Sequence, residues 1–142
     1  MLASMARESN LTSLSRNLVN QLIVRTAYQN HVVDKLIADE VSSVDHDSWK
    51  DVLRHYWEDG VKVRVAGKEI EYGYEYTGTH LLLVTTPLSQ ECFKYHSVNY
   101  SEGRSSVALG PPGTGKFETT KDLARLLGRP CRNLAKPEMA AH

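Results

Sequence analysis

The sequence has 142 residues, about one domain in length, and its 41% hydrophobic content excludes a disordered chain of low hydrophobicity. Basic and acidic residues number 17 each, so a formal net charge of zero gives no support for a nucleic-acid or membrane-surface partner. The two cysteines have no metal-binding spacing and predict buried thiols in a reducing compartment. The start has no apolar signal segment, and the longest apolar run, residues 81–84, cannot span a bilayer, so we expect a soluble intracellular protein.

Two apolar stripes in the first half of the chain have helical spacing. Leucines that recur every three or four residues predict a helix over about residues 9–38, with Ser9 or Asn10 as its cap. A second stripe at positions i, i+3, i+4 and i+7 predicts a shorter helix, capped by Asp45 or Asp47 and ended at Asp59-Gly60. The members of this second stripe are Trp49, Val52, Leu53 and Tyr56.

The hydrophobic period then changes to two, which predicts a β-hairpin with its turn at residues 66–68. The apolar and aromatic positions are Val61, Val63, Val65, Ile70, Tyr72, Tyr74 and Tyr76. The tyrosines could form a packed face or a stacking platform for bases. Their strict alternation and the neutral charge favour the packed face.

The last part of the chain has the order strand, glycine-rich loop and helix. Residues 81–84 predict a short extended segment, and Pro87 opens a helix over about residues 87–97. Residues 105–109 (SSVAL) are the strand candidate, and a helix over residues 115–127 follows the loop, ended by Gly128.

The stretch GPPGTGKF at residues 110–117 satisfies the phosphate-binding P-loop pattern except at its last position. In such a loop, backbone amides at a helix N-terminus surround a phosphate, and the lysine adds a positive charge. The sequence therefore predicts a binding site for ATP or ADP, weighed against a purely structural Gly/Pro loop. The predicted phosphate-binding residues are Gly110, Pro111, Pro112, Gly113, Thr114, Gly115 and Lys116.

Phe117 occupies the position where the pattern requires serine or threonine. It has no oxygen to coordinate Mg²⁺, so we expect weak phosphate binding to survive and metal-assisted hydrolysis to be impaired. Thr119 and Thr120 are rotated away by about 100° per residue and are not simple replacements. The six histidines show no convincing ligand spacing. We predict no protein metal site and no catalytic residue.

Three ordered segments together resemble dynein heavy chains over residues 18–131. GPPGTGKFETTKDLARLLG resembles the P-loop of their first AAA+ module, and EYGYEYTGTHLLLVTTPLSQECF resembles the entry into that module. VSSVDHDSWKDVLRHYW resembles the last helices of the dynein linker, the lever element before the ring.

The resemblance implies an α/β fold consisting of an incomplete P-loop AAA+ module preceded by linker helices and a β-hairpin. Residues 1–66 would be the C-terminal part of the linker, residues 67–131 the N-terminal part of the module, and residues 132–142 a divergent tail. It also implies that Pro87 and Leu88 lie near the adenine.

The resemblance further implies that the chain is the ATP-binding segment of a microtubule-based motor. Its partners would be the rest of a dynein heavy chain and its complex, with microtubules contacted only indirectly, and its location the cytoskeleton of a cilium axoneme. Neither nucleic acid nor a membrane is expected as a partner. An axonemal class is expected before a cytoplasmic one.

Three departures from the family pattern favour an alternative. Phe117 replaces the metal-binding threonine, residues 95–106 differ from the family, and agreement stops after Cys131. Neither the acidic Walker B strand nor the sensor residues are found, so hydrolysis by this chain alone is not expected. The alternative is a non-catalytic structural or interaction fragment, or a truncated relic, with weak or no nucleotide binding, and we expect marginal stability from the single unpaired strand.

Overall fold

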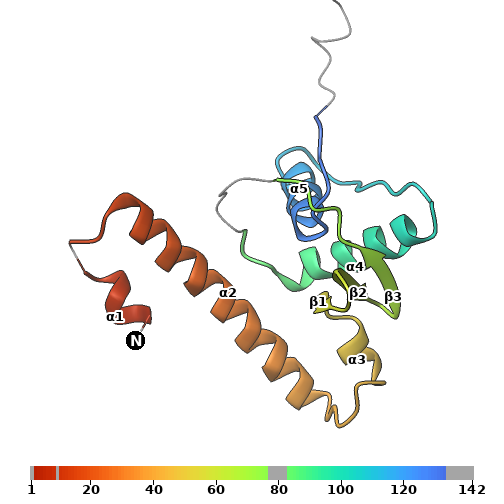
Figure 1. Cartoon of the computed structure of the whole chain (residues 1–142), viewed down its shortest axis with the longest axis horizontal. Coiled ribbons are helices and arrows are strands. Elements are labelled where there is room, and N and C mark those ends of the chain that lie inside the picture. Colours follow the sequence, from red (N-terminus) through yellow and green to blue (C-terminus); the bar gives the residue numbers. More distant parts are fainter. Residues whose placement is uncertain (1, 9, 77–82, 134–142) are drawn as a thin grey trace, which may run out of the picture.

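The computed structural model describes residues 2–8, 10–76 and 83–133, and it combines helices with a small β-sheet (Figure 1). The elements in chain order are α1 (Leu2–Ala6), α2 (Ser13–Ala38), α3 (Asp47–Lys50), β1 (Arg54–Trp57), β2 (Val61–Val65), β3 (Lys68–Glu71), α4 (Pro87–Ser101) and α5 (Lys116–Leu126). No helix of the described part is long and apolar enough to cross a bilayer. The predicted extended segment at 81–84 and the divergent tail lie partly outside the described residues.

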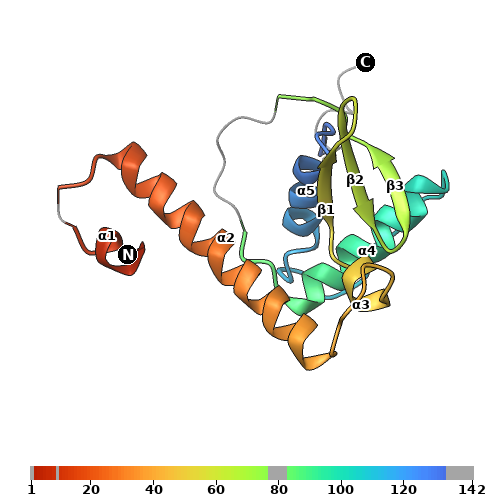
Figure 2. The ribbon, with the colours of Figure 1, turned by 60° about the horizontal axis from the view of Figure 1, so that its bottom comes forward.

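The long first helix is confirmed, although its cap is different from the predicted one. α2 begins after Thr12, whose hydroxyl accepts a hydrogen bond from the Ser15 amide at 3.1 Å. Only Val19 of α2 is buried, and α2 projects away from the rest of the fold (Figures 1 and 2). The Tyr28 hydroxyl accepts a hydrogen bond from the Gln90 amide on α4 at 3.3 Å and attaches the helix there.

The predicted second helix is wrong over most of its length. α3 is a single turn capped by His46, and the chain then extends into β1, which pairs with β2. The apolar stripe fits both a helix and a strand, and pairing with β2 decides for the strand. Trp57, at the end of β1, is 78% exposed.

The predicted hairpin is confirmed as β2 and β3, and with β1 it forms an antiparallel sheet in the order β1-β2-β3. Ala66 and Gly67 make the turn, both with positive φ. β3 ends at Glu71, earlier than the alternating tyrosines predicted.

One face of the sheet is covered by α4 and α5 (Figure 2). The buried cluster combines alternate sheet residues with apolar residues of the two helices. Its members are Val63, Val65, Ile70, Phe93, Leu123 and Leu127. Each such side chain contributes about 1.5–3 kcal/mol of burial free energy, so this cluster is the main source of stability. Cys92 is half-buried and Cys131 is exposed, so the prediction of two buried thiols is wrong for Cys131.

The chain after β3 is held against the C-terminal end of α5. The amide of Gly73 donates to the Leu127 carbonyl, and that of Glu75 donates to the Gly128 carbonyl, both at 2.9 Å. Tyr72 packs over Gly128, whereas Tyr76 is exposed, so the tyrosines form a packed face only in part.

The predicted strand before the glycine-rich loop is wrong. Residues 105–109 have no strand pairing, and the side chains of Val107 and Leu109 are 77% and 89% exposed. A strand needs a neighbour to satisfy its backbone, and the described sheet is a separate antiparallel unit that offers none to these residues. The α/β class is therefore confirmed as a mixture of helices and strands, without the strand expected before the loop.

Asp122 on α5 is buried, with 5% of its surface exposed, and lies 3.6 Å from Arg125. Burial raises its pKa above the ordinary 3.8, Arg125 opposes the shift and Glu118 adds to it. Because the folded-state pKa is the higher one, the charged carboxylate costs stability at neutral pH, and that cost fades as the pH falls toward 3.8.

We therefore expect Asp122→Asn to unfold at a higher temperature than the parent chain at pH 7, with the difference disappearing below about pH 3.8. Circular dichroism melts over a pH series measure this. Asp34→Asn, at an exposed position of α2, is the control. A constant difference between Asp122→Asn and the parent at every pH would contradict the assignment.

Candidate functional site

The glycine-rich loop at residues 110–116 joins the exposed segment after α4 to the start of α5 (Figure 1). Gly113 and Gly115 have φ values of +78° and +76°, in the left-handed region that glycine enters at little cost. Gly115 is the residue before the first turn of α5. These two glycines let the chain curl directly into the helix N-terminus.

Lys116 lies across this loop. Its ammonium group donates hydrogen bonds to the carbonyl of Gly110 at 2.9 Å, to that of Pro111, and to the Thr114 hydroxyl at 3.2 Å. The Thr114 hydroxyl in turn donates to the Pro111 carbonyl at 2.9 Å. The structure thus brings four of the predicted residues together around one positive charge, while Pro112 is exposed beside them.

The start of α5 presents amide groups that have no partner within the described residues. Gly115 supplies no side-chain cap, and the first helical hydrogen bond runs from the Thr119 amide to the Gly115 carbonyl. The amides of residues 116–118 therefore remain available, at the positive end of the helix dipole. Such amides, next to a lysine, are suited to bind an anion of the size of a phosphate.

Phe117 is 44% exposed and lies in the first turn of α5, beside the ammonium group of Lys121. The two following threonines are turned back onto the helix. The hydroxyl of Thr119 donates to the Gly115 carbonyl at 2.9 Å, and that of Thr120 donates to the Lys116 carbonyl at 3.0 Å. Both hydroxyls are therefore bonded to backbone carbonyls four residues before them.

Two features near the loop were not found from the sequence. The Thr114 side chain stabilises the loop by its hydrogen bond to Pro111, although the P-loop pattern allows any residue at this position. After α5, the Arg129 side chain donates to the Glu71 carbonyl at 3.1 Å and lines a cavity of about 240 Å³. Pro87 and Leu88 lie in the first turn of α4, with the Leu88 side chain exposed.

The second half of the chain matches a known protein family. Residues 72–138 match the family described as "Hydrolytic ATP binding site of dynein motor region". This range contains the glycine-rich loop, α4 and α5. By this match, the second half of the chain is similar to the AAA-type motor region of dyneins.

Curated relatives extend the similarity to most of the chain. It is 35% identical over 127 residues, 87% of its length, to the human dynein axonemal heavy chain 6. It is 39% identical over 118 residues to the mouse dynein axonemal heavy chain 1, and 43% identical over 100 residues to the pig dynein axonemal heavy chain 11. These alignments cover 82% and 68% of the chain respectively.

The chain belongs to the dynein heavy chain family. It spans only 2–3% of the length of the relatives named here.

Proposed function

We propose that the glycine-rich loop binds the phosphates of ATP or ADP, as the ATP-binding segment of a dynein heavy-chain motor. The observation that carries this proposal is the partnerless amides of residues 116–118, located next to the Lys116 ammonium group. The phosphate-contacting residues would be those predicted from the sequence, Gly110 to Lys116. The family match over residues 72–138 supports the same assignment.

In the free chain, Lys116 is bonded to loop carbonyls, so nucleotide binding requires its ammonium group to turn toward the phosphate. Once turned, it supplies a charge-assisted hydrogen bond, and the helix amides supply the others. Because Phe117 offers no oxygen, we propose that binding depends little on Mg²⁺.

We propose that this segment binds nucleotide without hydrolysing it. The acidic residues adjacent to the loop in sequence, Glu118 and Asp122, lie on α5 itself, and Asp122 is paired with Arg125. Neither is placed on a separate element that faces the loop, as a general base for the attacking water would have to be.

The wider context is also a proposal. Residues 1–66 would belong to the linker, residues 67–131 to the first AAA+ module and residues 132–142 to a divergent tail; the start of the family match at residue 72 supports this division. The relatives named above are axonemal heavy chains, which supports a role in a dynein complex of the cilium axoneme that acts on microtubules.

A second candidate function is a structural segment that binds no nucleotide. Two observations favour it: the Lys116 ammonium group already binds carbonyls of the loop, and Phe117 offers no ligand for a metal. A binding experiment separates the two candidates.

We expect a fluorescent ATP analogue to bind the full chain, and Lys116→Ala to weaken that binding about 10- to 100-fold, since a charged hydrogen bond contributes about 1.5–3 kcal/mol. Fluorescence titration with Mg²⁺ and with EDTA measures both affinities. Lys121→Ala is the matched control, because it removes a lysine of the same helix outside the loop.

If Lys121→Ala and Lys116→Ala reduced nucleotide binding equally, the assignment of the loop as the binding site would be contradicted. No detectable binding by the folded parent chain would favour the structural segment instead.

A further inference from the structure

The sheet face opposite α4 and α5 carries charged and aromatic side chains. The residues that alternate with the core positions lie on this outer face, and they are Arg54, Tyr56, Lys62, Arg64, Glu69 and Glu71. Most of the charges are paired across the strands. Arg64 contacts Glu69 at 2.8 Å and Glu58 at 2.7 Å, and Lys62 contacts Glu71 at 3.2 Å.

Arg54 is the exception among the described residues of this face. It lies directly opposite Arg64 in the sheet register, a like-charge pair that is destabilising by itself. Its guanidinium contacts no carboxylate of the described chain; it donates to the Val52 carbonyl at 3.1 Å and to the Tyr56 hydroxyl at 2.9 Å. The Trp49 ring lies below it at 4.7 Å. Arg54 is thus held in place by neutral groups, with its charge uncompensated.

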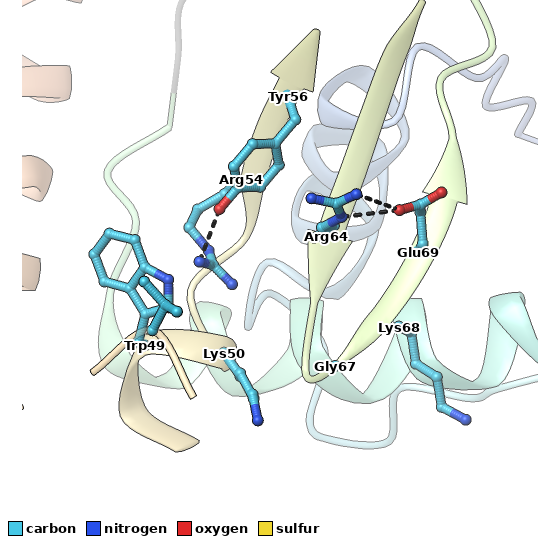
Figure 3. Close-up of a pocket in the computed structure, with 9 residues that line it drawn as sticks. Trp49, Lys50, Arg54, Tyr56, Arg64, Gly67, Lys68 and Glu69 are labelled. Carbon is cyan, nitrogen blue, oxygen red and sulfur yellow. Dashed lines mark hydrogen bonds and ion pairs between the residues drawn. The ribbon is translucent and has the colours of Figure 1, made fainter. Parts of the chain in front are cut away.

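A pocket of about 420 Å³ opens beside this arginine, between α3 and the outer face of the sheet (Figure 3). Its charged lining residues are Lys50, Arg54, Arg64, Lys68 and Glu69, so cations outnumber the single carboxylate. The aromatic rings of Trp49 and Tyr56 form an apolar wall.

We propose that this pocket is a docking site for an acidic peptide segment of a partner protein, with one carboxylate bound by Arg54. Glu69 already binds Arg64 in this way within the sheet, and the incoming carboxylate would repeat that arrangement one strand further along. A guanidinium fork matches a carboxylate better than a single ammonium group does.

The aromatic wall of the pocket favours a segment over a small free anion. Figure 3 shows the Lys50 and Lys68 side chains pointing away from the two guanidinium groups. At the rim, Lys50 lies 3.4 Å from the exposed Asp45, and Lys68 lies 2.8 Å from Glu102. Both lysines already have carboxylate partners, so Arg54 is the main charged contact, and the Trp49 and Tyr56 rings offer an apolar surface that a peptide segment can cover and a small anion cannot.

The test uses the full chain and a short fluorescein-labelled peptide in which Glu alternates with Ser. We expect measurable binding by fluorescence anisotropy, and about a tenfold loss with Arg54→Gln, because a charged hydrogen bond is lost. Lys50→Gln, at the exposed rim, should weaken binding only about two- to threefold. Arg25→Gln, on the exposed surface of α2, is the matched control for net charge.

A second readout places the peptide in the pocket without changing the pocket. Trp49 is the pocket tryptophan, and Trp57 is exposed outside it, so Trp57→Phe leaves Trp49 as the single tryptophan, which can be excited selectively at wavelengths too long for the tyrosines. The peptide should change the Trp49 emission in this variant.

Three results would each overturn the proposal. The first is that a peptide with Gln in place of Glu binds as tightly. The second is that Arg25→Gln reduces binding as much as Arg54→Gln. The third is that free citrate displaces the peptide at equal carboxylate concentration. The last result would assign the pocket to a small anion.

Discussion

Replacing Gly128 by alanine should destabilise the chain by about 2–4 kcal/mol, a large effect for a single added methyl group. Gly128 has a φ of +61°, and a Cβ atom there would lie 2.5 Å from the Tyr72 ring. The ring cannot retreat easily, because it contacts the Tyr74 ring edge-on at 5.1 Å and packs against the core.

The consequences of that clash extend to the backbone. The carbonyls of Leu127 and Gly128 accept the hydrogen bonds that hold Gly73 and Glu75 beside α5. Moving Gly128 away from Tyr72 lengthens both bonds, so the segment after β3 would separate from the helix. Through these two hydrogen bonds the segment holds the sheet against α5, the helix that begins at the glycine-rich loop.

Gly67→Ala is the matched control for the Gly128 prediction. Gly67 has a similar φ of +70°, but nothing lies within 4 Å of its added Cβ, so only the backbone cost of about 1 kcal/mol remains. Urea unfolding followed by circular dichroism gives both free energies. Tyr72→Ala combined with Gly128→Ala should cost less than the sum of the two single changes, because the smaller side chain removes the clash. Equal costs at Gly67 and Gly128 would contradict this account.

The parts of the fold that the sequence predicts are those set by local periodicity. The leucine spacing of α2, the alternation of β2 and β3, and Pro87 at the start of α4 each act over a few residues. Their ends are less well predicted: Thr12 caps α2, and β3 stops at Glu71, where the chain turns to contact α5.

The errors concern segments whose conformation depends on distant partners. Residues 54–57 have a pattern compatible with a helix, but they form a strand because β2 lies alongside them. Residues 105–109 have strand propensity but no described neighbour to pair with. Pairing between strands is a non-local property, so neither outcome can be read from the spacing of the residues themselves.

The candidate site shows the same division. The two glycines with positive φ and the lysine beside them follow from the motif, because the motif describes local backbone geometry. The lone charge of Arg54 has no such motif, since it arises from the cross-strand register with Arg64 and from the stacking of Trp49. Sites that depend on cross-strand register, such as Arg54, are found only from the three-dimensional structure.

Phe117→Thr should convert the loop into a magnesium-dependent nucleotide site. A hydroxyl at this position can coordinate Mg²⁺ next to the phosphates, and one added charge-assisted contact is worth about 1.5–3 kcal/mol. We therefore expect nucleotide affinity in Mg²⁺ to rise about 10- to 100-fold over the parent chain, with the gain abolished by EDTA. Fluorescence titration of the ATP analogue measures both conditions.

Phe117→Val is the matched control, because valine has nearly the shape of threonine without its hydroxyl. Both variants remove the ring beside Lys121, so only the metal contact distinguishes them. An equal gain with valine would mean that the bulk of the ring obstructs the loop, and the role given to the missing hydroxyl would be wrong. Phosphate release should stay absent in both variants, because Glu118 and Asp122 remain on α5 and cannot orient an attacking water toward the loop. Restoring the metal ligand would thus separate binding from hydrolysis.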